Sequence, residues 1–490
     1  MEMLPITSRH VTLGENLSST PGQNRPKVYS QSQIDPLVSF RNAHGESVRG
    51  TLVSLQRKAL VMEVYNPDFF FQVSEVAHEL TVRMGSKVAY CGRALVISSV
   101  NTGLTAVVSL TLIDEWSELR EAALVPGAMG AESASFVRGW TERYRIGRDY
   151  QAVVNEMRAF LSDVSRWVDQ VDLSDALPKE DGMLREDLFY ELAGPLMEKT
   201  QGYLERLEHE AARIDTELAP AHRAFAQSAL HPLILRAPFV FRTYTKPLGY
   251  AGDYQMVNQL LGDPRQGPST YFQIVNTAFL QAAVAEAHRN RIDILVDFLT
   301  RLADDARARG TPARVLNIAC GPAVEIQRFL ESYPEPHWLQ FELLDFSAET
   351  LDWTRAQLES RAAKAARPVQ IKYVQDSVHA LLKRRTSLTQ GRQPEFDVVY
   401  CAGLFDYLSD KVCARLLNHF AGRMRPGGTM LVTNVHSDNP GRHGMEHLLE
   451  WHLIYRDESG LEALLPAGVR ERKIYVDATG VNVFAEVEIA

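Results

Sequence analysis

The distribution of hydrophobic and polar residues changes along the chain, and its clearest pattern lies in the C-terminal part. From residue 312 onward, continuous apolar runs alternate with stretches in which apolar residues recur every three or four positions. Such runs are typical of parallel strands buried on both faces, and the stretches between them of helices that cover the sheet. The last two runs, 471–478 and 481–489, suit an antiparallel pair at one edge. The pattern predicts an α/β domain with a seven-stranded, mostly parallel sheet.

The chain before this domain has three segments that differ in composition and in hydrophobic pattern. Residues 1–33 are rich in Ser, Thr, Pro, Asn and Gln, which indicates a mobile tail or a loosely packed arm. Residues 34–116 contain short runs rich in Val, Thr, Ile and Tyr, separated by Gly or Asn, which predicts a small antiparallel β-barrel. Residues 117–300 have helical spacing, with charges between the apolar positions, and predict a helical linker and lid region. The α/β domain then occupies 301–490.

Composition narrows the functional classes. The net charge is −9 and the isoelectric point is about 5.9, which argues against nucleic acid, because binding to phosphates relies on clustered Lys and Arg. The four cysteines lie far apart, without CxxC or His/Cys spacing, so we expect no metal site and the reduced thiols of a cytoplasmic protein. The N-terminus lacks the basic and apolar runs of a secretory signal. No run of about 18 apolar residues predicts a membrane span.

The segment "VLNIACGPAVEI" (315–326) predicts a strand, a tight turn and a helix. Nucleotide-binding units place small residues at such a turn so that a ligand can approach the backbone. The dinucleotide fingerprint has three glycines, whereas only Gly321 is present here. This difference disfavours an NAD-dependent enzyme, which is the alternative interpretation of the fold. The turn therefore suits a ligand that has no pyrophosphate.

Four more signals follow in order. Asp345 ends the next strand, where an acid suits ribose hydroxyls. "YVQDSV" (373–378) comes next, then a strand and its loop, "FDVVYCAGLFDYL" (396–408), and a turn before another strand, "RMRPGGTMLVTNV" (423–435). Each signal alone has a structural explanation, since Asp345 could cap a helix and the cysteines could be small buried residues. Their order and spacing together indicate a ligand site.

These ordered signals resemble the class I S-adenosylmethionine (SAM)-dependent methyltransferases, which have a Rossmann-like fold. The resemblance implies SAM as methyl donor and S-adenosyl-L-homocysteine as product. It places the amino-acid part of SAM at the glycine-containing loop, the ribose at Asp345 and the adenine amino group near Asp376. Asn317 replaces the acid that the family usually has there. The cofactor-binding residues so implied are Asn317, Ala319, Cys320, Gly321, Asp345, Phe346, Asp376, Ser377, Cys401, Ala402 and Gly403.

The segment "FRTYTKPLGYAGDYQMVN" (241–258) differs from the helices around it. Its proline and two glycines interrupt any helix, and its polar and aromatic side chains suit a segment that closes over a site and excludes water. It resembles a Lys-Pro-x-Gly-Tyr-Ala-Gly-Asp stretch in a subgroup of bacterial methyltransferases. These are described as biosynthesis proteins for the extracellular factor 3-hydroxypalmitic acid methyl ester, a quorum-sensing signal. Tyr250 and Asp253 are catalytic candidates; alternatively, Tyr250 packs and Asp253 caps a helix that starts at Tyr254.

Three more catalytic candidates lie near the fifth predicted strand. "MEHLLEWHLIYRDE" (445–458) falls in an insertion where such enzymes often build a substrate pocket, and on a helix Trp451 and Tyr455 would share a face. Tyr455 and Arg456 could reach the substrate, and Arg456 could grip a carboxylate or simply be a solvated surface residue. His436 follows the strand at the end of the sheet where ligands bind, and could act as a base or orient a hydroxyl.

The segment "RGTLVSLQRKALVMEV" (49–64) resembles the core of a PilZ domain, a small barrel that often binds cyclic di-GMP. The usual binding strand has Asp or Asn, then Ser, then Gly, where this chain has Ser54, Gln56 and Ala59. Arginines, which bind phosphates and guanine edges, are also few near it. The resemblance thus predicts a PilZ-like barrel that does not bind cyclic di-GMP and instead mediates dimerisation or packing.

Two classes of function remain. The first is a SAM-dependent methyltransferase of a small molecule, with the carboxyl group of a hydroxy fatty acid as favoured acceptor by resemblance, or as an alternative an O- or N-methyltransferase of another metabolite. The second is a cyclic di-GMP-responsive regulator whose methyltransferase fold binds SAM. A carboxylate acceptor is already ionised and needs no general base, whereas a hydroxyl or amine would use one such as His436 or Asp253. We also consider a homodimer.

Overall fold

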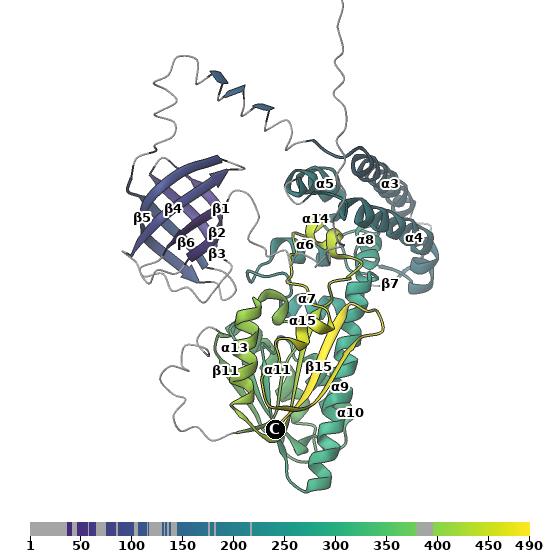
Figure 1. Ribbon diagram of the computed structural model, residues 1–490. Helices are drawn as coiled ribbons and strands as arrows, with labels where there is room; N and C mark the ends of the chain where they lie inside the picture. The colour runs from purple at the N-terminus through teal and green to yellow at the C-terminus, as the bar shows by residue number, and fades with distance from the viewer. Residues whose placement is uncertain are drawn as a thin grey trace, which may run out of the picture.

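The computed structural model describes residues 37–41, 47–56, 58–64, 75–84, 87–101, 106–114, 116, parts of 130–138, 145–174, 177–180, 183–215, 218–378, 381 and 395–490. Along the chain, these residues form a β-barrel, a group of helices and an α/β domain (Figure 1). The tail predicted at 1–33 lies outside the described residues.

The first body is a closed antiparallel barrel with the strand order β1-β2-β3-β6-β5-β4. Its strands are β1 (Leu37–Arg41), β2 (Ser47–Leu55), β3 (Ala59–Val64), β4 (Val76–Met84), β5 (Lys87–Asn101) and β6 (Ala106–Leu112). Burial alternates along β3 and β6, so that every second side chain enters one apolar core inside the barrel. Gly50 is needed where β2 meets β3, because a Cβ there would lie 2.4 Å from the Glu63 carbonyl oxygen. The predicted barrel is confirmed, while its PilZ-like identity stays a prediction.

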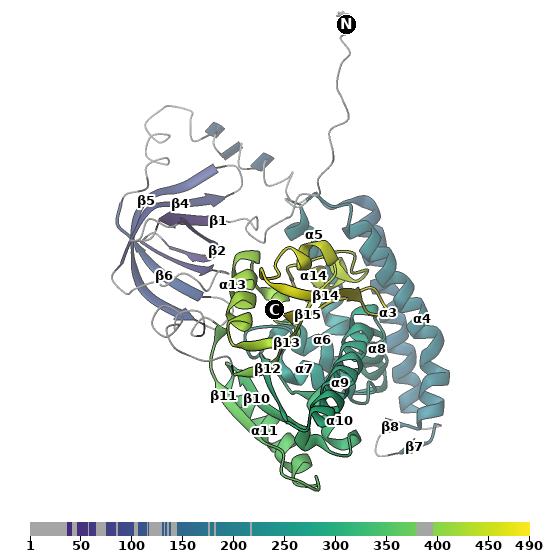
Figure 2. The same ribbon diagram turned by 60° about the horizontal axis from the view of Figure 1, so that its bottom comes forward.

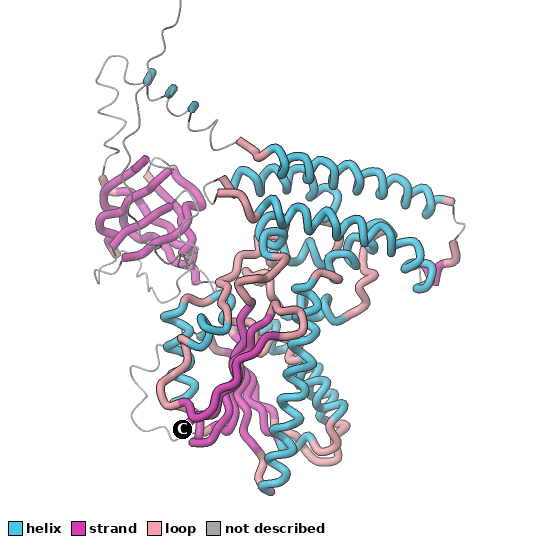
Figure 3. Tube along the Cα trace, turned by 45° about the vertical axis from the view of Figure 1, so that its right-hand side comes forward, coloured by secondary structure: helices cyan, strands magenta, loops and turns pink. Residues whose placement is uncertain are grey.

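The second body is helical and lies at one end of the sheet in Figure 3. Its helices are α3 (Arg148–Leu173), α4 (Glu186–Ala211), α5 (Ala219–Ile234), α6 (Pro238–Thr245), α7 (Tyr254–Leu261), α8 (Thr270–Leu280) and α9 (Ala283–Arg309). A two-stranded hairpin, β7 (Lys179–Glu180) and β8 (Met183–Leu184), joins α3 to α4. Every residue of α8 is buried, since α3, α4 and α6 pack around it.

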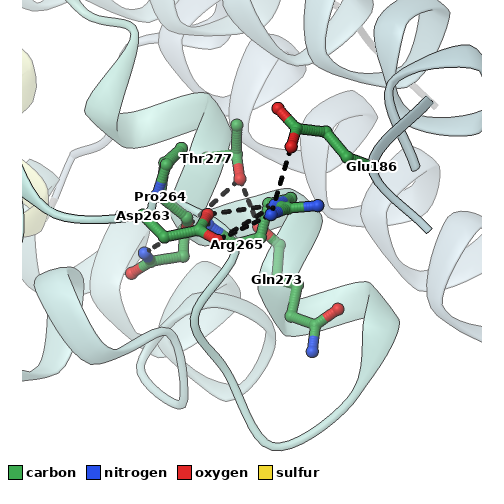
Figure 4. Close-up of polar contacts among 7 residues, drawn as sticks. Glu186, Asp263, Pro264, Arg265, Gln273 and Thr277 are labelled. Atoms are coloured by element: carbon green, nitrogen blue, oxygen red, sulfur yellow. Dashed lines mark hydrogen bonds and ion pairs between the residues drawn. The ribbon is translucent and has the colours of Figure 1, made fainter. Parts of the chain in front are cut away.

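The loop between α7 and α8 is fixed by polar contacts (Figure 4). The Arg265 guanidinium pairs with the Asp263 carboxylate at 2.7 Å, and that charge keeps the pKa of Asp263 below its usual value. The Pro264 carbonyl oxygen accepts hydrogen bonds from Asn276 Nδ2 (2.8 Å) and Thr277 Oγ1 (3.2 Å) of α8. Because the bonding groups of the loop are satisfied inside the protein, α7 and α8 hold a fixed relative position.

The third body contains a seven-stranded sheet with the order β11-β10-β9-β12-β13-β15-β14. Its strands are β9 (Ala313–Ile318), β10 (Leu339–Asp345), β11 (Ile371–Gln375), β12 (Phe396–Cys401), β13 (Met424–Val435), β14 (Val469–Val476) and β15 (Asn482–Ile489). The first five strands are parallel, and β15 pairs antiparallel with both β13 and β14. The predicted mostly parallel sheet and the antiparallel pair at its edge are confirmed.

Helices cover both faces of this sheet, as Figure 2 shows. They are α10 (Val324–Ser332), α11 (Ala348–Ala362), α13 (Asp410–Ala421), α15 (Glu458–Glu462) and part of α9. Helix α14 (Arg442–Leu448) instead packs against α4 and α5 of the helical body. Successive strand residues point to opposite faces, so Val315 joins an apolar core with α9, α10 and α11, and Leu316 joins a second core with α13. Because both faces of the sheet are buried, consecutive strand residues are apolar, which is the pattern found in the sequence.

Two features differ from the sequence analysis. The helix after β13 ends at Leu448, and Glu450 has a left-handed backbone (φ 48°), so 450–457 is extended and the helical face proposed for Trp451 and Tyr455 does not exist. Helix α9 spans the boundary placed between 300 and 301, and it joins the helical body to the sheet as one rod. Within the described part of the chain, no helix has the length and apolar character needed to cross a lipid bilayer.

Candidate active site

A cavity lies at the carboxyl ends of the central parallel strands, where ligands bind in open α/β sheets. The residues that follow β9, β10 and β12 form its floor. The first half of α9 and the loop before α7 form a second wall, and the extended segment after α14 contributes Trp451 and Leu453. The helical body and the α/β domain therefore both contribute to one site.

The loop after β9 has an unusual backbone. Ala319, Gly321 and Ala323 have φ values of 54°, 52° and 47°, a region that non-glycine residues seldom adopt. A Cβ on Gly321 would meet no atom within 4 Å, so the space above this glycine is open. Ala319, Cys320 and Gly321, all predicted from the sequence, line the cavity. The loop thus presents its backbone to a ligand.

Asp345 connects two loops of the site. Its carboxylate accepts hydrogen bonds from the backbone N–H of Gly321 (3.1 Å) and of Ser347 (3.0 Å). Only 4% of this residue is exposed, and burial raises the pKa of its carboxyl group above the usual value. Each oxygen has bonded one N–H, which leaves further lone pairs for a ligand in the cavity.

Aromatic and polar residues follow on the same side. Phe346 lines the cavity, and the Tyr250 ring lies 5.7 Å from it, centroid to centroid. Asp376 and Ser377 also line the cavity, and the Asp376 carboxylate accepts a hydrogen bond from the Ser377 backbone N–H at 2.9 Å. The structure therefore brings the predicted residues of three separate loops together around one space.

Of the three residues predicted at the end of β12 and in the loop after it, two line the cavity and one does not. Ala402 and Gly403 line the cavity, and Gly403 has a φ of 97° that only glycine adopts without strain. A Cβ there would also lie 3.0 Å from Arg291 Nη1. Cys401, in contrast, is outside the cavity lining: it is fully buried in the core beneath the sheet, and burial raises the pKa of its thiol.

Three buried charged residues in the cavity wall were missed by the sequence analysis: Glu325, Arg291 and Asp406, whose Oδ1 accepts the Val435 N–H at 2.6 Å. The Glu325 carboxylate, at the start of α10, accepts hydrogen bonds from Tyr400 Oη (2.8 Å) and Asn317 Nδ2 (3.2 Å). The Arg291 guanidinium, on α9, is 8% exposed and has no hydrogen bond or ion pair within the described part of the chain. Burial lowers the pKa of Arg291 and raises that of Glu325. Asn317 therefore acts with a carboxylate that comes from the next helix.

The segment before α7 contributes only one of its two candidates to the cavity. Tyr250 lines it, and burial raises the pKa of its hydroxyl, which stays protonated. Asp253 is the N-cap of α7: its Oδ1 accepts the Met256 N–H (2.9 Å) and pairs with the Arg242 Nε (2.8 Å). The structural alternative considered for Asp253 describes its position, and it does not line the cavity.

The three candidates around β13 also lie outside the cavity lining. His436 Nε2 pairs with the Glu458 carboxylate at 3.0 Å on the surface side. The Arg456 guanidinium donates all five of its hydrogens within the protein, to the Asp410 carboxylate, the Asn434 side chain and two backbone carbonyls. Tyr455 is partly buried, and the Arg442 guanidinium lies over its ring, 4.5 Å from the centroid. These side chains hold the insertion to the sheet, and the structure gives none of them a ligand-facing group.

Comparison with known protein families supplies the next observation. Residues 315–428 match the model of a family described as a methyltransferase domain. The chain carries a methyltransferase domain. The matched range begins within β9 and contains the loops that form the cavity floor. The predicted enzyme class, a SAM-dependent methyltransferase with SAM as cofactor, is confirmed by this match. No curated protein matches the chain.

Solved structures give only weak likenesses. A protein described as a possible exported protein from Bordetella parapertussis is 16% identical, at a TM-score of 0.40, over 61% of this chain and 96% of that chain. Magnesium protoporphyrin IX methyltransferase from Synechocystis PCC 6803, with bound S-adenosyl-L-homocysteine, is 12% identical, at a TM-score of 0.34, over 51% and 98%. N-methyltransferase NodS from Bradyrhizobium japonicum WM9 is 13% identical, at a TM-score of 0.30, over 48% and 97%. At these scores the likenesses carry no argument about function.

Proposed function

We propose that this protein transfers the methyl group of SAM to the carboxyl group of a hydroxy fatty acid and so forms a methyl ester. The coarser part of this statement, a small-molecule methyltransferase, follows from the methyltransferase domain. The observation that carries the proposal is the pair of opposite charges, Arg291 and Glu325, in the wall of a cavity at the strand ends.

The two charges fit the amino-acid end of SAM. The Arg291 guanidinium makes no hydrogen bond within the described residues, and the buried carboxylates of Asp406 and Glu325 act on it only through their charge, so its N–H groups can bond an anion. Glu325 accepts its two hydrogen bonds at Oε1, which leaves Oε2 for a cation. The α-carboxylate of SAM would bind Arg291, and its α-ammonium would bind Glu325. Glu325 thereby takes over the role that the resemblance assigns to an acid at position 317. No ion pair joins Arg291 and Glu325 directly, so both remain available for a ligand.

The rest of the cofactor would extend along the strand ends. The Asp345 carboxylate would accept hydrogen bonds from the two ribose hydroxyls, while it keeps its bonds to Gly321 and Ser347. Phe346 would contact one face of the adenine, and Asp376 and Ser377 its edge. These assignments rest on the lining of the cavity and on the resemblance together.

The proposed acceptor end of the cavity is mostly apolar, with Tyr407 and His288 as its polar groups. Its apolar lining is Met256, Val257, Leu404, Leu408, Leu453 and Trp451. Such a lining suits an aliphatic chain, because burying apolar area contributes roughly 25 cal/mol per Å². This supports a fatty acyl acceptor over a strongly polar metabolite, which remains the alternative.

Catalysis would depend on alignment rather than on proton transfer. SAM, when bound, presents a methyl group already activated by the positive charge of its sulfonium. The loop after β12 and Tyr250 would hold the acceptor oxygen in line with that methyl, and such alignment contributes on the order of 7–11 kcal/mol at best. The Tyr250 ring, the Trp451 ring and the start of α7 would exclude water. A carboxylate acceptor needs no base, so the positions of Asp253 and His436 outside the cavity are compatible with the proposal.

We propose a packing or dimerising role for the barrel, without cyclic di-GMP. The sequence has two arginines near the strand that binds cyclic di-GMP in PilZ domains, Arg41 and Arg49. Arg41 pairs with the Glu79 carboxylate at 2.9 Å, so it is engaged within the protein. The same proposal places the protein in the cytoplasm. Titration calorimetry with cyclic di-GMP tests it, and binding of the dinucleotide would favour the regulatory alternative.

The enzymatic proposal is tested with methyl-labelled SAM. The purified full chain is incubated with hydroxy fatty acids and, for comparison, with amines, alcohols and phenols. The products are identified by mass spectrometry. We expect a labelled methyl ester of a hydroxy fatty acid. A labelled ether or methylamine as the main product would replace the carboxyl acceptor by a hydroxyl or an amine.

A further inference from the structure

The acceptor end of the cavity contains two polar groups whose bonding is incomplete. They are the Tyr407 hydroxyl, in the loop after β12, and the His288 imidazole, on α9. Trp451 contacts both: its Nε1 donates to Tyr407 Oη at 3.0 Å, and its ring lies 6.3 Å from the His288 ring, centroid to centroid. Tyr407 lies in the segment 396–408 that the sequence analysis singled out, but neither residue was among its candidates.

Tyr407 has a proton to donate. Its oxygen accepts one hydrogen bond, from Trp451 Nε1 at 3.0 Å. A phenol oxygen that accepts an N–H group keeps its own O–H as a donor. Within the described part of the chain, no group accepts that hydrogen. Burial raises the pKa of the hydroxyl, so the proton stays on the oxygen.

His288 has a lone pair to offer. Its Nδ1 lies 2.7 Å from the carbonyl oxygen of Val284, and a carbonyl can only accept, so Nδ1 carries the hydrogen. The neutral ring must then have an unprotonated Nε2, and this atom has no partner within the described part of the chain. The ring stays neutral, because burial first and the charge of Arg291 second lower its pKa to about 3.

The two groups together specify a ligand. We propose that His288 and Tyr407 bind an uncharged hydroxyl group of the acceptor, which donates to His288 Nε2 and accepts from the Tyr407 O–H. A carboxylate at this place would face the lone pair of His288, and an ammonium would face the hydrogen of Tyr407. Only a group that both donates and accepts satisfies both partners.

Charge elsewhere in the cavity supports this assignment. Arg291 is the single basic side chain in the described lining besides the neutral His288, and the proposed function gives it to the cofactor. No second cation is left among the lining residues to hold an anion beside Trp451. The inference rests on the proposed function: the hydroxyl positions a hydroxy acid, and the carboxyl group lies toward the methyl donor. It involves recognition only, and no covalent bond changes at this hydroxyl.

The test compares an acceptor with its deoxy analogue. Rates with 3-hydroxypalmitate and palmitate are measured with methyl-labelled SAM for the wild type, His288→Phe and the surface control His209→Phe. Sites built to bond a substrate hydroxyl reject the analogue without it by factors of up to about 10⁴. We expect at least a 100-fold preference for the hydroxy acid in kcat/KM, on the order given by that principle. His288→Phe should reduce it to about tenfold or less, and His288→Gln, which keeps an acceptor atom, should restore part of it.

Binding measurements separate a failure of the proposed fatty-acid acceptor from a failure of the inference about its hydroxyl group. SAM affinity, measured by calorimetry, should be unchanged in His288→Gln and His209→Phe. If neither acid is methylated while SAM still binds, the fatty-acid proposal fails, and the same comparison is made with the acceptor that the product screen identifies. Equal rates for that acceptor and its deoxy analogue, an acceptor without any hydroxyl, or an unchanged preference in His288→Phe would overturn the inference.

Discussion

Arg291 provides the sharpest test of the site, because its buried guanidinium makes no hydrogen bond or ion pair among the residues that the structure describes. Arg291→Met removes the charge and keeps much of the volume of the side chain. A hydrogen bond between charged groups contributes about 1.5–3 kcal/mol, so the dissociation constant of SAM should rise by about 10- to 150-fold. Arg291→Lys keeps a charge but not the planar fork, so its dissociation constant for SAM should lie between those of the wild type and Arg291→Met.

The assay is titration calorimetry with two ligands. SAM has the carboxylate that Arg291 would bind, whereas 5′-methylthioadenosine has the same adenine and ribose without the amino-acid group. We expect Arg291→Met to weaken SAM alone and to leave 5′-methylthioadenosine within about twofold, which is under 0.5 kcal/mol. Circular dichroism checks the fold. Equal losses for both ligands would mean that Arg291 only supports the structure, and unchanged SAM affinity would remove it from the site.

Three other predictions concern the site and its support. Asp345→Ala should weaken both SAM and 5′-methylthioadenosine by tenfold or more, about 1.4 kcal/mol, in the same calorimetry, whereas the exposed control Asp352→Ala should change neither. Arg456→Ala should lower the free energy of unfolding in urea by roughly 1–3 kcal/mol, since it leaves the Phe405 and Leu408 carbonyls without their buried donor, and no measurable effect would contradict the structural role. Burial first, and the Arg223 charge second, lower the pKa of His447 to about 3, below its value near 6.5 in the unfolded chain. The unfolded state then binds more protons between these values, so stability falls as pH drops from about 6.5, and His447→Gln should flatten this dependence in urea unfolding at pH 7 and pH 5.

The parts of the site that follow local rules could be predicted from the sequence. Small residues at the end of a buried strand predict a turn that a ligand can approach, and Gly321 lies in that turn with open space above it. An acid at the end of the next strand predicts a ligand contact, and the Asp345 side chain reaches back to the N–H of Gly321. Both statements concern the ends of neighbouring parallel strands, which must meet at one edge of a sheet.

The parts that depend on long-range packing could not be predicted. Arg289 and Arg291 are two residues apart on one helix: Arg289 bonds to the carbonyls of Leu260 and Leu280, while Arg291 faces the cavity. Sequence spacing gives no way to tell which one faces the sheet. An acid in the first turn of a helix, such as Glu325, usually has an explanation in the helix dipole. Arg456 was chosen for its planar fork, which the structure occupies entirely with internal bonds.

Helix α9 has a consequence for any attempt to shorten the protein. This single helix carries His288 and Arg291 near its beginning and packs against the sheet core through residues such as Leu295 and Phe298 farther along. A fragment that starts at 301 would keep every loop matched by the methyltransferase model and still lack both side chains. On the roles proposed for these two side chains, the smallest autonomous catalyst within this chain begins ahead of Ala283, and exchanging the loops after the strands would leave both proposed contacts on α9 in place.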